Sequence, residues 1–284
     1  MQQKLNPQNK CDDDYVSTLE YFLAHSNKDT LNIDAVMDEL QTHFCKQPKA
    51  ESNCINILDI GPGNGAKTFY LIEQLRRLGI ESVLDVIEPK ESQRQHLANN
   101  HSKLPKPCLN HVFTAPLVSN TSSPCEQGKK YDLVLMIHSL YEFPRNDNNL
   151  ITPFQHLPSL LKTNGLGLII NEHPKGDFQH LKRELYPNFS YPAPTNINMI
   201  MDTLNHYQLT AQLGKTIEYN FDVTDLISQN EKQIGNKLSF LFSTDLTGNK
   251  LSTDQAKQIG LWVKTNAKQY TLYTPDQVIW FSKT

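Results

Sequence analysis

No apolar run in this sequence approaches the roughly 20 residues that a membrane-spanning helix needs. The first fifteen residues, MQQKLNPQNKCDDDY, lack the apolar core of a secretory signal peptide. The five cysteines are scattered without a C-x-x-C pair, which predicts neither a disulfide framework nor a zinc site. We therefore expect a cytoplasmic protein with reduced thiols and no bound metal.

The chain also lacks an excess of charge of either sign. It has 27 Lys and Arg residues against 30 Asp and Glu residues, for a formal net charge of -3, and no basic stripe. This balance predicts no nucleic-acid partner. The length of 284 residues is enough for one large α/β domain with additions, and no internal repeat is visible.

One stretch, Ile55 to Lys90, organises the rest of the chain. An apolar run, Ile55–Ile60, predicts a buried strand, and the glycine turn GPGNG follows it. Apolar residues at helical spacing come next, and a second apolar run, Val83–Ile87, ends at Glu88. This order of strand, glycine turn, helix, strand and acid predicts a βαβ unit that holds a nucleoside.

Each part of this unit has a physical role. Glycines let the backbone turn sharply and let a ligand approach where a Cβ would clash. The N–H groups at the start of the helix favour a carboxylate or a phosphate. Glu88 follows the glycines at about the spacing, ~20 residues, of an acid that accepts the protons of ribose hydroxyls.

The glycine pattern leaves the choice of nucleoside open. Gly61, Gly63 and Ala66 satisfy the dinucleotide pattern G-x-G-x-x-G/A, which keeps a dehydrogenase as an alternative. Asp59, Gly61, Gly63 and Gly65 form D-x-G-x-G-x-G, which resembles motif I of the class I methyltransferases that use S-adenosylmethionine. An ordinary strand-to-helix turn is the third interpretation.

The remaining patterns predict further elements around this unit. Two N-terminal helices, which either close over a substrate or cover the sheet edge, come before the first strand. Further parallel strands and a helix follow Glu88, and two long strands with helices between them end the chain. The predicted helices and strands are Asp14–Ala24, Asn32–Phe44, Leu109–Thr114, Tyr131–His138, Phe154–Leu161 (stopped by Asn164-Gly165), Leu166–Asn171, Asp177–Leu185, Thr195–His206, Leu209–Phe221, Asp222–Leu226, Lys232–Phe242, Thr253–Lys264 and Tyr270–Phe281.

The final strand pair resembles the antiparallel pair that finishes a class I methyltransferase sheet. We therefore expect a Rossmann-like α/β sheet, mostly parallel, with an antiparallel C-terminal strand pair and helices on both faces. Residues 1–50 are expected to form a helical cap. Residues 51–284 are expected to form the cofactor-binding domain, with helical insertions between the last two strands.

Taken together, ordered segments over residues 15–284 resemble the histamine N-methyltransferase family. These segments are YFLAHSNKD, ILDIGPGNG, VIEPKESQ, YDLVLMIHSLYEF, FQHLPSLLKTNGLGLII and KGDFQHLKRELYPNF. The resemblance implies S-adenosyl-L-methionine as cofactor. The cofactor contacts that motif I and the resemblance imply are Asp59, Gly61, Gly63 and Gly65 in the turn, Glu88 on the ribose, Gln93 near the adenosine, and Ile137 and His138 near the adenosyl and methyl ends.

The chain departs from that family on the substrate side. Lys28 stands where the family has a glutamate, His138 stands where it has a glutamine, and the position of a family asparagine falls near Thr274. The resemblance therefore does not imply that a glutamate holds a cationic substrate.

Three residues at the end of the fourth predicted strand and just after it are catalytic candidates. His138 could accept a proton or orient an amine, and its alternative role is a wall of the pocket. Tyr141 and Glu142 could bind a cation by ring face and charge, although Glu142 could equally cap a helix. Glu172 and His173 end the fifth predicted strand, toward the same rim of the sheet.

The sequence thus predicts an enzyme that methylates a small molecule, with N-methylation of an amine or imidazole favoured. Methyl transfer needs mainly alignment of the nucleophile and exclusion of water. Methylation of an oxygen or a carboxylate remains an alternative, as does a non-catalytic nucleoside-binding module that acts through a partner. We expect a small-molecule acceptor and no membrane partner, and the sequence is compatible with a monomer.

Overall fold

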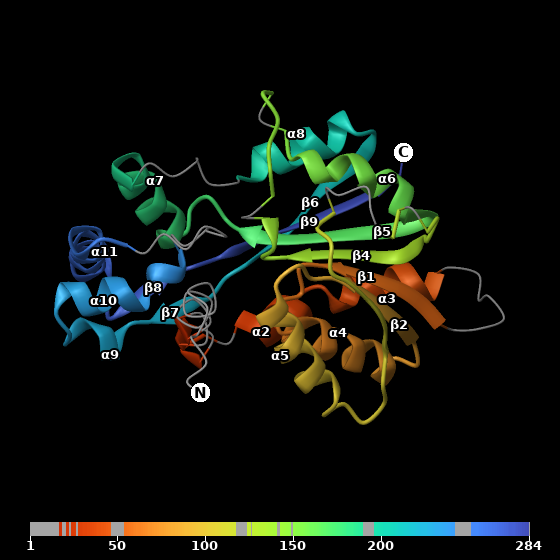
Figure 1. Ribbon diagram of the computed structural model, residues 1–284, viewed down its shortest axis with the longest axis horizontal. Helices are drawn as coiled ribbons and strands as arrows, with labels where there is room; N and C mark the ends of the chain where they lie inside the picture. Colours follow the sequence, from red (N-terminus) through yellow and green to blue (C-terminus); the bar gives the residue numbers. More distant parts are fainter. Residues whose placement is uncertain are drawn as a thin grey trace, which may run out of the picture. The chain divides into compact units, whose positions relative to one another are not determined.

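A computed structural model (Figure 1) describes most of the chain in two compact units. The described residues are 17–18, 21–22, 24–26, 28–46, 54–117, 124–125, 127–140, 143–148, 150–189, 196–241 and 251–283. The sheet unit comprises Asp29–Asn171, Thr195–Ile217 and Gln277–Thr284, and the helical unit comprises Met1–Lys28, Glu172–Pro194 and Glu218–Asp276. In the described part of the chain, no helix is long and apolar enough to span a bilayer.

A seven-stranded sheet forms the centre of the sheet unit, in the order β3-β2-β1-β4-β5-β9-β6. β1 pairs in parallel with β2 and β4, β2 pairs in parallel with β3, and β4 pairs in parallel with β5. The strands are β1 (Cys54–Ile60), β2 (Glu81–Ile87), β3 (Leu109–Phe113), β4 (Tyr131–Ile137), β5 (Leu161–Glu172), β6 (Leu209–Ile217) and β9 (Asp276–Lys283).

Helices cover both faces of this sheet, and this arrangement explains why its inner strands are nearly continuous apolar runs. Figure 1 shows α6 and α8 on one face and α3, α4 and α5 on the other. These helices are α3 (Met37–Lys46), α4 (Ala66–Arg77), α5 (Glu91–His101), α6 (Leu157–Leu160) and α8 (Ile197–His206). Because β1, β2, β4 and β5 are parallel, their carboxyl ends lie at one edge, where ligands bind in such sheets.

The strand β9 lies between β5 and β6 and runs opposite to β5 (Figure 1). The aromatic ring of Phe281, on β9, packs directly on Gly167 of β5. A Cβ on Gly167 would lie 2.0 Å from this ring. The expected sheet, mostly parallel with an antiparallel strand near the end of the chain, is therefore confirmed.

Two long strands were predicted wrongly as continuous. The predicted strand Leu209–Phe221 is divided into β6 and β7 (Asn220–Asp222), and Tyr270–Phe281 is divided into β8 (Thr271–Tyr273) and β9. β7 and β8 pair antiparallel in a separate two-stranded sheet of the helical unit. Pro275 lies between β8 and β9, and a proline, which has no N–H to donate, cannot continue a strand ladder.

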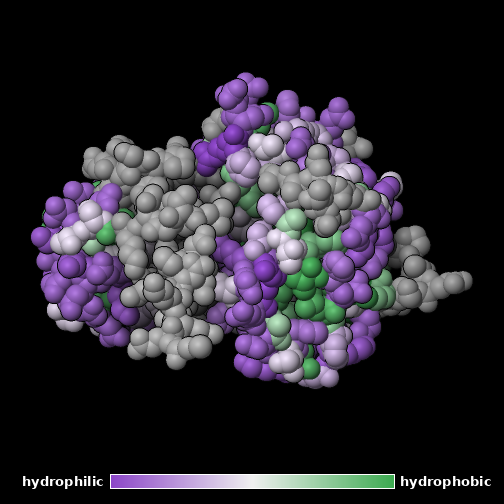
Figure 2. Space-filling model, in the orientation of Figure 1, coloured by the Kyte–Doolittle hydropathy of each residue, from purple (hydrophilic) through white to green (hydrophobic). Residues whose placement is uncertain are grey.

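The helical unit has its own core, built from aromatic and aliphatic side chains such as Phe178, Phe221 and Trp262. Its helices α10 and α11 pack so closely that a Cβ on Gly235 would lie 1.9 Å from a backbone oxygen of α11. The helices of this unit are α7 (Asp177–Phe189), α9 (Thr224–Ile227), α10 (Glu231–Lys237), η3 (Ser239–Leu241) and α11 (Thr253–Asn266). Figure 2 shows hydrophilic residues over most of the visible described surface, with one hydrophobic area on the sheet unit.

Other predicted boundaries also need correction. The helix expected over Asn32–Phe44 is two helices, α2 (Lys28–Asp34) and α3, separated by a turn at Ala35 and Val36. The helix expected over Phe154–Leu161 is a 3-10 turn, η2 (Thr152–His156), followed by α6, which has Pro158 in its first turn.

The predicted stop at Asn164-Gly165 lies inside β5. A Cβ on Gly165 would lie 2.8 Å from the backbone oxygen of Tyr131, so the glycine allows an irregular strand pairing there. Most of the predicted first N-terminal helix lies outside the described residues.

Candidate functional site

The glycine turn between β1 and α4 has a backbone that other residues rarely adopt. Gly61, Gly63 and Gly65 have φ values of 76°, 59° and 77°, in the region that glycine enters without strain. The N–H of Gly61 donates to the oxygen of Ile87 at 2.8 Å, and Gly65 is the N-cap of α4. The turn is thereby fixed to β2 on one side and to the helix on the other.

The three glycines differ in what surrounds them. A Cβ on Gly61 would lie 2.6 Å from the Cβ of Ser139, and one on Gly65 would lie 2.4 Å from Leu97. These two positions are closed by packing. A Cβ on Gly63 would meet only Gln93 Oε1, at 3.5 Å, so the space above Gly63 is the open part of the turn.

Glu88 fixes the glycine turn by accepting a backbone hydrogen bond from it. It is 5% exposed, and its Oε2 accepts the N–H of Gly63 at 3.0 Å while its Oε1 accepts the N–H of Lys90 at 3.0 Å. The two bonds therefore orient the carboxylate at the end of β2, beside the glycine turn.

Asp59, at the end of β1, is buried beneath the same turn. Burial raises the pKa of its carboxyl to about 7, the hydroxyl of Thr68 lowers it, and the charge of Glu88 raises it further. Thr68 Oγ1 donates to Asp59 Oδ2, while Asp59 Oδ1 is buried without a hydrogen-bond partner. Asp59 thus joins β1 to α4 under the turn.

The remaining predicted residues of the sheet unit lie at the same edge. Gln93 is in the first turn of α5, above Gly63, and Ile137 ends β4. His138 follows with φ 54°, and its N–H donates to Ile170 O at 3.0 Å. Tyr141 and Glu142 lie outside the described residues, so their predicted roles stay predictions.

Solved structures align with this chain over most of its length. A predicted methyltransferase from Bacillus halodurans is 10% identical, with a TM-score of 0.55, and the match covers 88% of this chain and 100% of that one. The chain has the class I methyltransferase fold. YcgJ from Bacillus subtilis is 13% identical, with a TM-score of 0.53 and coverage of 85% and 96%.

A third structure, a predicted sarcosine dimethylglycine methyltransferase from Galdieria sulphuraria, is 13% identical. Its TM-score is 0.51, and the match covers 89% of this chain and 85% of that one. No protein-family model matches the chain, and no curated protein matches it in sequence.

Within this class I methyltransferase fold, the edge residues fit S-adenosylmethionine. The open space over Gly63 and the start of the twelve-residue helix α4 suit the carboxylate of a methionine group. The oriented carboxylate of Glu88 suits ribose hydroxyls, and Gln93 lies beside the same space. The residues that would hold the cofactor are therefore those of the turn, Glu88 and Gln93.

The helical unit contains a different polar group, around Lys28. Lys28 is 4% exposed, and its Nζ lies 3.1 Å from Asp276 Oδ1, 4.7 Å from the ring centre of Tyr219 and 5.5 Å from that of Phe22. A carboxylate and two aromatic faces make a typical ammonium site. The chain's own lysine fills this site.

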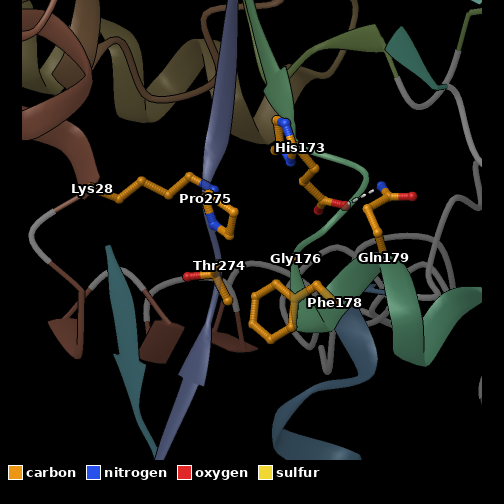
Figure 3. Close-up of a pocket in the computed structure, with 8 residues that line it drawn as sticks. Lys28, His173, Gly176, Phe178, Gln179, Thr274 and Pro275 are labelled. Carbon is orange, nitrogen blue, oxygen red and sulfur yellow. Dashed lines mark hydrogen bonds between the residues drawn. The ribbon is translucent and has the colours of Figure 1, made fainter. Parts of the chain in front are cut away.

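Lys28 also lines a narrow hollow of the helical unit, drawn in Figure 3 with Thr274, Phe178 and Gln179. The hollow is too narrow for a water molecule. Glu172 is ion-paired with Lys182 at 2.8 Å and accepts from Gln179 at 2.5 Å. The buried charges around the hollow are thus compensated within the protein.

Burial and the charge of Lys175 hold the pKa of His173 below its usual value. No residue of the glycine turn lines the hollow near Lys28. None lines the open polar hollow beside α8 either. The chemistry of the glycine turn, and not the shape of these hollows, therefore identifies the candidate site.

Sequence reasoning missed three residues at the carboxyl edge of the sheet: Asn32, Thr68 and Ser139. Thr68 lies in the first turn of α4, nine residues after Asp59, and a motif that stops at the glycines does not include it. Ser139 packs on Gly61 with a buried, unpartnered hydroxyl. The contact between Asn32 and His138 spans 106 residues, so no local pattern could have found it.

Proposed function

We propose that this protein is an S-adenosylmethionine-dependent methyltransferase that methylates a nitrogen of a small amine or imidazole. The observation that carries the proposal is the hydrogen bond from Gly63 of the glycine turn to the carboxylate of Glu88. One carboxylate fixes the open glycine, Gly63, and lies directly after β2, where an acid accepts ribose hydroxyls in such units. This combination suits an adenosyl ligand bound at the carboxyl edge of the sheet.

When bound, S-adenosylmethionine supplies a methyl group already activated by a positively charged sulfur. The protein's part is therefore to align an acceptor and to exclude water, and a neutral amine needs no strong base. Glu88 and the turn hold the nucleoside. His138 follows β4 beside the turn, since its neighbour Ser139 packs on Gly61, and it orients the acceptor.

The first test is isothermal titration of the full chain with S-adenosylmethionine, S-adenosylhomocysteine and NAD. We expect both adenosyl ligands to bind and NAD not to bind. Binding of NAD alone would favour the dehydrogenase interpretation of the glycine turn and overturn the proposal.

The second test is incubation with S-adenosylmethionine and a panel of primary amines, secondary amines and imidazoles, followed by mass spectrometry of the products. Matched alcohols and carboxylic acids of the same carbon skeletons serve as controls. A gain of one methyl on nitrogen compounds alone is the expected result. Methylation of the alcohols or acids instead would reassign the acceptor to oxygen, and cofactor binding without any product would favour a binding module.

A further inference from the structure

Asn32 is a buried amide with one end unused. It lies on α2 in the sheet unit, is 0% exposed, and has its Nδ2 3.4 Å from His138 Nε2. Its Oδ1 is also buried and has no hydrogen-bond partner. A buried acceptor left without a partner destabilises the folded protein. Such an atom needs an explanation, and a bound water or ligand is one.

The position of His138 places this unused oxygen at the candidate site. His138 follows β4, its backbone is in the left-handed region, and the next residue, Ser139, packs against Gly61 of the glycine turn. A non-glycine residue at positive φ is held there by its surroundings and is often found at functional sites. The amide of Asn32 therefore reaches the same edge of the sheet as the turn.

We propose that Asn32 positions the methyl acceptor, with Nδ2 donating to His138 Nε2 and Oδ1 accepting the N–H of the nitrogen that is methylated. This inference rests on the proposed function and narrows it. The acceptor is a nitrogen that carries both a hydrogen and a free lone pair, so primary and secondary amines are substrates, and tertiary amines and imidazoles are not.

The chemistry gives this hydrogen bond a reason to assist the reaction. The nitrogen lone pair forms the new N–C bond, the C–S bond of the donor breaks, and its electron pair stays on sulfur. The proton stays on the nitrogen, which becomes positively charged, until it passes to water. Because a charged N–H is a stronger donor, its bond to Oδ1 strengthens as the reaction proceeds. Interactions that strengthen in the transition state raise the rate.

The orientation of the amide has a spectroscopic signature that needs no acceptor. An amide NH2 can only donate, so a bond from Nδ2 requires an unprotonated Nε2 and hence the Nδ1–H tautomer of His138. Histidine side chains in water prefer the opposite, Nε2–H, tautomer. 15N NMR of the histidine rings, at a pH where they are neutral, distinguishes the two forms.

We expect the Nδ1–H tautomer for His138 in the wild-type protein and the Nε2–H tautomer in Asn32→Leu. Asn32→Asp has the same size and cannot donate, so it should also give Nε2–H, and it serves if the Leu variant does not fold. Asn110→Ala removes the hydrogen bond from the side-chain amide of Asn110, on β3, to Asp85 on β2. It is the matched control and should change nothing at His138. An Nε2–H tautomer in the wild-type protein would mean that Oδ1 of Asn32, and not Nδ2, faces His138. This result would overturn the proposal.

Stability and kinetics separate a role in acceptor binding from a structural role. Asn32→Leu removes a buried unpaired oxygen, so we expect the unliganded protein to unfold at the same urea concentration or a higher one. Affinity for S-adenosylhomocysteine should stay within twofold, and kcat/KM for the amine found in the panel should fall roughly 5- to 150-fold.

A less stable Asn32→Leu protein with unchanged kcat/KM would make Asn32 structural and refute the inference, as would turnover of a tertiary amine at the same rate. Neither result would touch the proposed function. That function fails separately, if the wild-type protein binds no adenosyl ligand.

Discussion

Replacing Glu88 by glutamine tests the hydrogen bonds that join Glu88 to the glycine turn, with one atom of the side chain changed. Each oxygen of Glu88 accepts one backbone N–H at 3.0 Å, from Gly63 and from Lys90. Glutamine keeps one oxygen and brings an NH2 group against the other N–H, so one bond is lost and two donors face each other. The residue is 5% exposed, and water therefore does not easily replace the lost acceptor.

The size of the effect follows from these bonds. A hydrogen bond to a charged group contributes about 1.5–3 kcal/mol, so the dissociation constant for S-adenosylhomocysteine should rise roughly 10- to 150-fold. Isothermal titration measures this directly. Glu91→Gln, which makes the same charge change at an exposed residue of α5, should leave the affinity unchanged.

A second ligand separates loss of the ribose contact from loosening of the turn. The wild-type protein should prefer S-adenosylhomocysteine over its 2′-deoxy analogue, and Glu88→Gln should lose most of that preference. If Glu88→Gln binds within twofold of the wild-type protein, or if Glu91→Gln is equally weakened, the assignment of Glu88 to the ribose is refuted.

Three further changes test other parts of the structure. Because burial raises the pKa of Asp59 to about 7, the folded state keeps a proton that the unfolded chain loses above its ordinary pKa of 3.8. The free energy of unfolding should therefore fall by roughly 1.4 kcal/mol per pH unit between those values, and Asp59→Asn should remove this dependence. If the urea midpoints of the wild-type protein and Asp59→Asn differ by the same amount at pH 5 and at pH 8, the prediction is wrong. Lys28→Met removes the ammonium 3.1 Å from the buried carboxylate of Asp276 and should cost about 3–5 kcal/mol, of which the double variant Lys28→Met with Asp276→Leu should recover most. Equal losses of the two variants in urea unfolding would show that the two charges are not coupled. Gly61→Ala should lower both thermal stability and cofactor affinity. Gly79→Ala is the control for backbone strain, because Gly79 has φ 75°, close to the 76° of Gly61, and no atom lies near its Cβ. Similar effects of the two variants would rule out the predicted clash at Gly61.

Local signals in the sequence were sufficient for the nucleoside-binding unit. The predicted strand Ile55–Ile60 is extended only to Cys54, and the predicted strand Val83–Ile87 begins two residues earlier, at Glu81. Apolar runs, glycines and an acid at fixed spacing all lie within 36 residues, so short-range patterns determine this part. The resemblance to class I methyltransferases gave the correct fold for the same reason.

Contacts between distant segments could not be predicted in this way. The strands β6 and β7 belong to different sheets, although apolar residues continue through both, with buried side chains at Ile217, Tyr219 and Phe221. Nothing local marks the change between Ile217 and Asn220. The buried pair of Lys28 and Asp276 joins positions 248 residues apart (276 − 28), and the sequence shows each only as an ordinary charge.

The position of β9 has a consequence for how the protein is made. This strand follows the last segment of the helical unit in the chain, yet it lies inside the sheet, between β5 and β6. During synthesis, the facing edges of β5 and β6 remain without a partner until residue 283 has left the ribosome. Unpaired strand edges invite pairing with other chains. Nascent chains of this protein should therefore depend on chaperones late in translation, and release before β9 is complete should yield aggregates.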